Sequence, residues 1–186
     1  ADIKDRSDIY SLMIDNAREI EPGSGGVIVV PSFMPSGPNK PYETQGTILG
    51  LGLTTDRSQV YRAALEGLSF QLKQAVKAFY ETFSFEPTAV RVVGGGSKNH
   101  LWNQIRADVL GLPVITTSCE EGTVLGAALF AMVGSGIARS IEEAKKMVEI
   151  STRVWEPSEN WPYYQKLYEE YEKLPLFLAS HYRNKI

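Results

Sequence analysis

The sequence predicts an α/β domain in which a mixed sheet is flanked by helices, and three observations favour this class. Short, β-branched apolar runs alternate with amphipathic segments in the middle of the chain, which is typical of strand and helix layers. Clusters of glycine and proline separate these segments. Hydrophobic residues make up 43% of the chain and charged residues 22%, which are ordinary globular values. We therefore expect residues 1–186 to form a single domain with a real core.

Composition and charge exclude several classes of function. The formal net charge of −3 gives no electrostatic footprint for a nucleic-acid backbone. The single cysteine, Cys119, cannot form an internal disulfide, which favours a reducing compartment. No apolar run approaches the roughly 18 residues of a membrane span, and the first residues lack the apolar core of a signal peptide. We expect a cytoplasmic protein without nucleic-acid or membrane partners.

The first third of the chain is expected to contain two antiparallel strands between two helices. Ser7 is a plausible N-cap for a helix over residues 8–20, which carries an apolar stripe. Residues 27–30 predict a buried strand and residues 46–51 a second one, joined by a stiff, proline-rich loop over 31–45. The stripe of the first helix consists of Ile9, Leu12, Met13 and Ala17.

A long helix over about residues 58–82 follows, capped by Thr55 or Asp56. Apolar residues at steps of four predict its buried face, and its basic residues are most simply a solvated face. The apolar stripe consists of Val60, Ala64, Leu68, Leu72 and Val76, and the basic residues are Arg57, Arg62, Lys73 and Lys77.

The rest of the chain predicts strand, helix and strand, and then three further helices. Strands are expected over residues 89–93, 114–117 and 154–155. Helices are expected over residues 98–110, 121–133 and 161–182, together with a short helix that begins with a capping box of Ser140 and Glu143. The last helix carries Tyr164, Tyr168 and Tyr171, which are expected to pack in the core or at an interface.

The strongest local feature is the glycine turn, Gly94, Gly95 and Gly96, placed between a strand and a helix. Glycines let a ligand approach the backbone, and a helix N-terminus offers free N–H groups. Nucleotide or phosphate contact is therefore favoured over a bare turn. The turn is not a Walker A loop, because no Gly-Lys-Ser/Thr follows. Asn99 stands where a dinucleotide fingerprint needs its third glycine, so a dinucleotide-dependent oxidoreductase half-domain is the weaker alternative, with Glu120 and Glu121 as its acidic residues.

Other chemically active residue types are expected to have structural roles. Asp56 and Asp108 lie at a helix cap and in a last turn, respectively, where carboxylates are common. His100 and His181 have no partners at metal spacing, so no metal site is expected. Cys119 has no obvious base beside it. The small residues Gly122 and Gly126 are expected to serve helix–sheet packing rather than a ligand.

Two long motifs carry a resemblance to a known family. Residues 46–51 (GTILGL), followed after seven residues by 59–66 (QVYRAALE), resemble the second signature of the FGGY carbohydrate kinases. Residues 94–99 and the segment LWNQIRAD at 101–108 resemble that family's adenosine-binding turn and the helix after it. The similarity runs from about residue 7 to about residue 171.

The resemblance implies a two-lobed kinase with actin-like, ribonuclease H-like lobes, which binds ATP between them with Mg²⁺ on the nucleotide. Gly95 and Asn99 match family residues that contact the adenosine end, and Gly94 and Gly96 flank them. The family's catalytic aspartate lies upstream and has no counterpart here. The chain is therefore expected to be the C-terminal lobe of a longer kinase, nearly inactive alone, whose sugar contacts come from the other lobe. The sequence leaves open whether the protein forms a homo-oligomer.

The sequence of the loop after the first strand bears on the identity of the sugar substrate. Residues 31–40 (PSFMPSGPNK) and Gln45 depart from the pattern of many relatives and resemble the branch of the family that acts on L-fuculose. The resemblance implies transfer of phosphate to O1 of this ketose, with rhamnulose and xylulose as alternative substrates. A non-catalytic actin-like module that binds nucleotide or partners is a further alternative.

Overall fold

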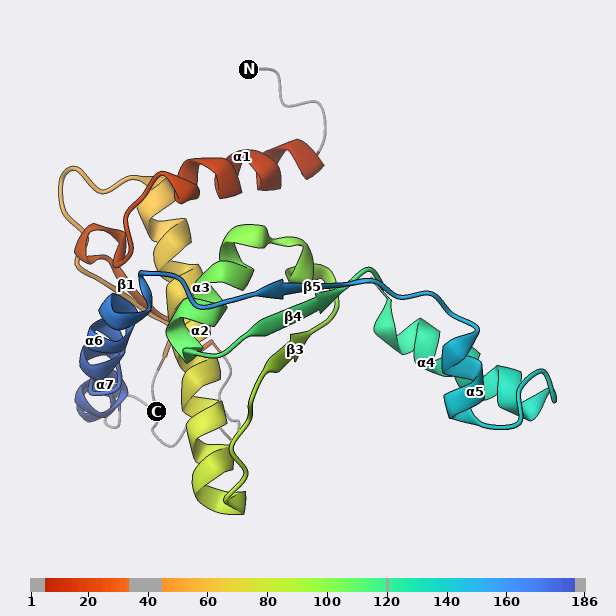
Figure 1. Cartoon of the computed structure of the whole chain (residues 1–186). Coiled ribbons are helices and arrows are strands. Elements are labelled where there is room, and N and C mark those ends of the chain that lie inside the picture. Colours follow the sequence, from red (N-terminus) through yellow and green to blue (C-terminus); the bar gives the residue numbers. More distant parts are fainter. Residues whose placement is uncertain (1–5, 34–44, 120, 183–186) are drawn as a thin grey trace.

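The computed structural model describes residues 6–33, 45–119 and 121–182, which form a helical body, two small sheets and a projecting pair of helices (Figure 1). Residues 34–44 of the proline-rich loop, which include most of the residues that suggested the sugar, and Glu120 lie outside these ranges. The elements are α1 (Arg6–Arg18), η1 (Ser24–Gly26), β1 (Ile28–Val30), β2 (Thr47–Leu49), α2 (Arg57–Phe83), β3 (Val90–Val92), η2 (Gly95–Lys98), α3 (His100–Leu110), β4 (Val114–Thr117), α4 (Gly122–Gly134), α5 (Ile141–Lys146), β5 (Thr152–Trp155), α6 (Trp161–Tyr171) and α7 (Leu174–Tyr182). None of the described helices is long and apolar enough to cross a membrane.

The strands form two sheets rather than one. β1 and β2 pair antiparallel, with Val29 opposite Ile48, as the sequence predicts. β3 pairs parallel with β4, and β4 pairs antiparallel with β5, so the three-stranded sheet is mixed, as expected. The helix α3 covers the buried face of this sheet, where Val114 and Thr116 lie. The α/β class with a mixed sheet is confirmed.

α2 is the central helix and begins as predicted. Asp56 is the N-cap: its carboxylate accepts hydrogen bonds from the backbone N–H groups of Ser58 and Gln59, and the Gln59 side chain completes a capping box. The predicted buried stripe is wrong in detail, because Leu68 is 38% exposed whereas Phe70 is 5% exposed. The reason is tertiary: α2 packs against β1 on one side and α3 on another, so its buried surface is wider than one stripe.

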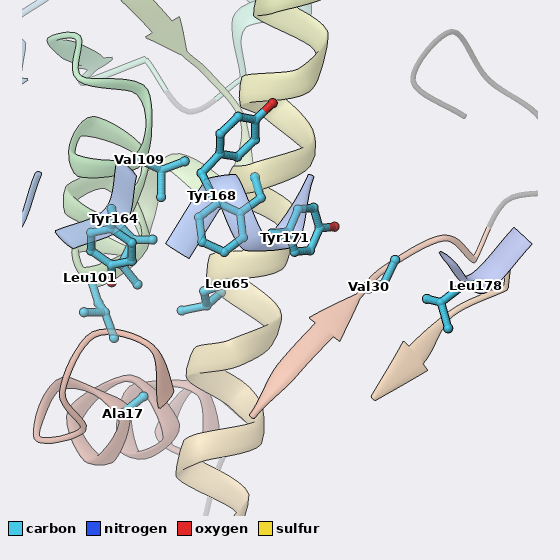
Figure 2. Packing of buried hydrophobic residues seen from close by; sticks show 11 residues of the cluster. Ala17, Val30, Leu65, Leu101, Val109, Tyr164, Tyr168, Tyr171 and Leu178 are labelled. Atoms are coloured by element: carbon cyan, nitrogen blue, oxygen red, sulfur yellow. The ribbon is translucent and has the colours of Figure 1, made fainter. Parts of the chain in front are cut away.

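The main core lies between α1, α2, α3 and the C-terminal helices (Figure 2). Tyr164, Tyr168 and Tyr171 on α6 are all buried and surround Phe70, whose ring centroid lies 4.8 Å from that of Tyr171. The core prediction for these tyrosines is thus confirmed. Aromatic pairs at such distances add to the free energy gained from burying apolar area.

Several helix boundaries differ from the prediction by one or two residues, and one predicted helix is broken in two. Ser7 is not an N-cap, because α1 already includes Arg6. The expected helix over 161–182 is broken into α6 and α7 around Lys173. The physical reason is Pro175, which has no backbone N–H to donate to the carbonyl oxygen of Tyr171. Helical hydrogen bonding resumes with the bond that the Phe177 N–H donates to the Lys173 carbonyl oxygen.

The helices α4 and α5 form an arm (residues 122–146) that projects beyond the end of the three-stranded sheet (Figure 1). Leu129 of α4 and Ala144 of α5 are buried together with Ala138 of the connecting segment. The helix–sheet packing expected of Gly126 is wrong, since a Cβ atom there would meet nothing within 4 Å. At Gly122, in contrast, an added Cβ atom would lie 3.8 Å from the Cβ atom of Val93, which directly follows β3.

Candidate nucleotide-binding site

The glycine turn leads from β3 into α3 through the short helix η2. Gly94 has φ 84° and ψ −174°, a conformation that L side chains rarely adopt, so the turn needs glycine there. A Cβ atom at Gly96 would lie 3.1 Å from the Trp102 ring, so packing also restricts that position. At Gly95 a Cβ atom would meet nothing within 4 Å, and its φ is ordinary. Gly95 therefore leaves open space beside the turn.

Two buried side chains of α3 hold the turn in place. The Asn103 amide nitrogen donates to the Ser97 carbonyl oxygen at 2.7 Å, and Arg106 donates to the Gly96 carbonyl oxygen at 3.3 Å. Arg106 also donates to the Asn103 Oδ1 atom, and its guanidinium lies 3.5 Å from the centre of the Trp102 ring. Burial lowers the pKa of Arg106 to about 10, so the group stays charged at neutral pH. This role of Asn103 and Arg106 was not predicted from the sequence.

A pocket of about 490 Å³ opens beside the turn, a volume typical of small-molecule sites. Helices α1 and α2, the turn and the start of α3 contribute its walls. Its lining residues are Tyr10, Ser11, Ile14, Tyr61, Leu65, Gly95, Gly96, Lys98, Asn99 and Trp102. Three of the four predicted site residues thus meet in one pocket, and Gly94 is not among its lining residues.

Asn99 has a second role that the sequence did not reveal. Its Oδ1 atom accepts a hydrogen bond from the backbone N–H of Trp102 at 3.0 Å, which makes Asn99 the N-cap of α3. Its Nδ2 atom donates to the Tyr61 hydroxyl oxygen at 3.2 Å. The capping signal could have been found, because asparagine before the first apolar residue of a helix is a common start signal.

The walls of the pocket suit a flat ligand that carries no positive charge. They combine aromatic and aliphatic surface with an amide, hydroxyl groups and the cationic side chain of Lys98, and they contain no carboxylate. Such a lining can stack on and hydrogen-bond to a base or a ribose, but it offers no oxygen pair for Mg²⁺. Within residues 6–33, 45–119 and 121–182 no group of three or more His, Cys, Asp or Glu residues could hold a metal ion.

Asp108 and His100, outside the pocket, make structural contacts. Asp108 is 2% exposed and accepts a hydrogen bond from the Ser158 backbone N–H at 2.6 Å, which ties α3 to the segment before α6. His100 packs against the Trp155 ring at 5.1 Å. Cys119 is a free, partly buried thiol.

A buried polar network lies next to the pocket and is centred on Arg62 and Glu66 of α2. Arg62 was expected on a solvated face, but it is 5% exposed. Its Nε atom lies 3.1 Å from Glu66 Oε1, and the same carboxylate accepts from Tyr164 and Gly23 and, through Oε2, from Ser24. Arg62 is buried for a tertiary reason, because η1 and α6 supply the hydrogen-bonding partners that a buried ion pair requires.

The other basic residues of α2 divide between core and surface. Lys73 is also partly buried, since it donates to Val109 O and to Gln165 Oε1 and lies over the Tyr168 ring. Burial lowers the pKa of Lys73. Arg57 is exposed, and Lys77 forms an exposed ion pair with Glu172, so the expected solvated face is confirmed for these two residues.

Comparison with known proteins places the chain in one family. Residues 1–135 match the FGGY family of carbohydrate kinases, C-terminal domain. L-fuculokinase of Escherichia coli (strain K12) is 38% identical over 148 residues, which are 80% of this chain and 30% of that protein. Glycerol kinase of Citrifermentans bemidjiense is 40% identical over 134 residues, which are 67% of this chain and 27% of that protein.

Solved structures show the same relationship. Xylulose kinase from Rhodospirillum rubrum has a TM-score of 0.79 at 25% identity, covering 97% of this chain and 36% of that one. Plasmodium falciparum glycerol kinase with ADP has a TM-score of 0.76 at 28% identity, covering 95% of this chain and 34% of that one.

The chain therefore belongs to the FGGY family of carbohydrate kinases. Its matched region lies in the C-terminal domain of that family, and the fold is that of the sugar kinases. The chain spans about a third of the length of the curated relatives that it matches.

Proposed function

We propose that this chain is the nucleotide-binding C-terminal lobe of an ATP-dependent ketose kinase, with L-fuculose as the favoured substrate. The observation that carries the proposal is the pocket beside the glycine turn, where Gly95, Gly96 and Asn99 meet aromatic walls. The pocket takes the adenine and ribose of ATP, because its lining is uncharged on most sides and rich in stacking surface. The relative crystallised with ADP, at 28% identity, supports this choice of ligand.

In the proposed reaction the O1 hydroxyl oxygen of the sugar attacks the γ-phosphorus of ATP. A new O–P bond forms, the bond from this phosphorus to the β–γ bridging oxygen breaks, and ADP leaves. The proton of O1 passes to a base, which the resemblance to the family implies is an aspartate outside this chain. Mg²⁺ travels with the nucleotide and neutralises charge on the phosphates. The described residues of this chain contribute positioning of the nucleotide, which is a large part of catalysis in phosphoryl transfer.

The sugar assignment rests on the relatives rather than on the pocket. L-fuculokinase of Escherichia coli (strain K12) matches over 80% of the chain, and the glycerol kinase of Caldanaerobacter subterraneus matches over 87%. Coverage therefore does not separate the two substrates, and the preference for L-fuculose rests on the resemblance of the loop over residues 31–40. The alternatives are L-rhamnulose, D-xylulose and glycerol. Release of ADP, measured with each sugar in the longest protein that contains this chain, separates them. The 186-residue chain alone is expected to show no turnover.

The nucleotide assignment is tested by an NMR titration of the chain with millimolar Mg·ADP, with NAD in parallel. We expect shifts centred on residues 94–99 with ADP. The variant Gly95→Leu fills the open space beside the turn and should weaken ADP binding by about tenfold or more, equivalent to about 1.4 kcal/mol. Gly126→Leu is the matched control, since Gly126 is equally open but lies on the arm.

The outcomes of this titration are distinct. Shifts with NAD but not with ADP would replace the kinase proposal by the oxidoreductase alternative. No shift with either ligand would overturn the pocket as a nucleotide site. Equal ADP affinity of Gly95→Leu and the unaltered chain would place the nucleotide elsewhere.

A further inference from the structure

The orientation of the Asn99 amide is fixed by its two hydrogen bonds. A backbone N–H can only donate, so the atom that faces the Trp102 N–H must be the oxygen Oδ1. The nitrogen Nδ2 then necessarily faces the Tyr61 hydroxyl, which accepts from it at 3.2 Å. The α3 N-terminus and a side chain of α2 thus hold one amide plane between them.

Tyr61 comes from a different element and is itself firmly held. It lies on the second turn of α2, its ring packs against the main core, and the next residue is the buried Arg62. Burial raises the pKa of Tyr61, which keeps the hydroxyl protonated around neutral pH. Both Tyr61 and Asn99 line the pocket beside the glycine turn. The amide therefore sits at the pocket wall with its plane set in advance.

We infer that Tyr61 is a positioning residue for base recognition: it aims the second Nδ2–H of Asn99 into the pocket, toward an unprotonated ring nitrogen of a purine. One Nδ2 hydrogen goes to Tyr61, and the amide has two. Within the part of the chain that the structure describes, no protein acceptor is recorded for the other. Fixing a donor before binding avoids the ordering cost of a free side chain, so the contact contributes more to affinity.

The inference rests on the proposed nucleotide site and deepens it. It separates two roles of Asn99 that one alanine substitution would remove together. The Oδ1 atom caps α3, whereas the Nδ2 atom faces Tyr61 and the pocket. Asn99→Asp keeps the capping acceptor, because aspartate and asparagine are comparable N-caps, but it removes the donor. Tyr61→Phe keeps the cap and the donor, but it frees the amide.

The experiment measures affinities of the chain for ADP and for its 1-deaza, 3-deaza and 7-deaza analogues, each lacking one ring nitrogen. In the unaltered chain, we expect one analogue to bind about three- to tenfold more weakly than ADP, as for the loss of one hydrogen bond. The Tyr61→Phe variant should bind ADP more weakly than the unaltered chain does, by a similar factor. Its affinity for that analogue should be little lower than its affinity for ADP. Such non-additivity shows that both changes remove the same contact.

Two controls make the result specific. Tyr80→Phe is the same chemical change on the same helix, at a half-exposed tyrosine outside the pocket, and should leave every affinity unchanged. Thermal unfolding of Asn99→Asp should match that of the unaltered chain, while its ADP affinity falls. A purely structural role of Asn99 would change stability and not the discrimination between ADP and its analogues.

Failure of the inference and failure of the proposed function give different results. If the unaltered chain does not bind ADP, the nucleotide site is overturned and the inference with it. If it binds ADP, and Tyr61→Phe keeps both the affinity and the discrimination, only the positioning role is overturned. Equal binding of ADP and all three analogues by the unaltered chain also overturns it.

Discussion

The helical body and the arm differ in how much of their apolar surface they bury. In the body, α2, α3 and α6 enclose a core in which Ile105 and Tyr164 are at most 1% exposed (Figure 2). In the arm, α4 is apolar nearly all round its axis, yet Phe130 is 71% exposed and Leu129 alone in this helix is buried. A helix that is hydrophobic on all sides is normally covered on all sides.

The difference teaches that burial depends on the partners that the fold supplies. α2 has β1, α1, η1 and α3 as neighbours, whereas α4 packs mainly on the short helix α5. We therefore expect the body to unfold as one cooperative unit and the arm to open locally at lower cost. The three tryptophans, Trp102, Trp155 and Trp161, all lie outside the arm, so their fluorescence reports on the body alone.

The largest expected effect is at the buried network of the body. Glu66→Gln removes the carboxylate charge that faces Arg62, and it should lower the free energy of unfolding by about 3–5 kcal/mol, because a buried charge is left uncompensated. Urea unfolding followed by tryptophan fluorescence measures this. The exposed Glu169→Gln is the control and should change little. A loss below about 1 kcal/mol for Glu66→Gln would show that the network contributes only as a surface pair does.

The next effect compares one apolar side chain in each region. Ile105→Ala should cost about 2–5 kcal/mol, since Ile105 is 1% exposed and a cavity would remain. Leu129→Ala in the arm should leave the tryptophan-detected midpoint unchanged while far-ultraviolet circular dichroism reports lost helix. A shift of that midpoint by Leu129→Ala would mean that arm and body unfold together.

Helix caps give a smaller version of the same comparison. Asn99→Ala in the body and Ser140→Ala in the arm each remove a side-chain acceptor from a helix N-terminus. Each change should cost its helix about 1 kcal/mol. Thermal melts followed by tryptophan fluorescence should register the first change and not the second. Equal shifts from both caps would contradict the independence of the two regions.

The smallest expected effect is on the exposed side of α4. Phe130→Ser should change the free energy of unfolding by no more than about 0.5 kcal/mol, because the ring is mostly in solvent. It should reduce binding of a hydrophobic dye such as ANS, which detects exposed apolar surface. Strong destabilisation by this change would show that Phe130 is buried in solution.

Local signals were predictable from the sequence because they depend on a few neighbouring residues. The N-cap at Asp56, one of the two residues expected to cap that helix, the helix end at Gly111 and the strand over residues 114–117 lie where they were expected. The glycine turn was also found, with its place between a strand and a helix. At the site, three of the four residues predicted to contact nucleotide, Gly95, Gly96 and Asn99, line one pocket, and their contact with a nucleotide stays a prediction.

Features that need distant partners were not predictable. Tyr10 and Tyr61 reach the pocket only because α1 and α2 pack beside α3. The burial of Arg62 depends on a carboxylate one turn away, on Tyr164 about a hundred residues later and on the carbonyl of Ala17. No local pattern distinguishes such an arginine from one in solvent.

The sequence by itself determined the order of the elements, their caps and the glycine turn, because backbone preferences and side-chain capping act over a few residues. The tertiary structure decided which charges are buried, how the strands divide between two sheets, and that α4 remains half covered. These outcomes are set by which surfaces meet, and a surface loses water only where another element covers it.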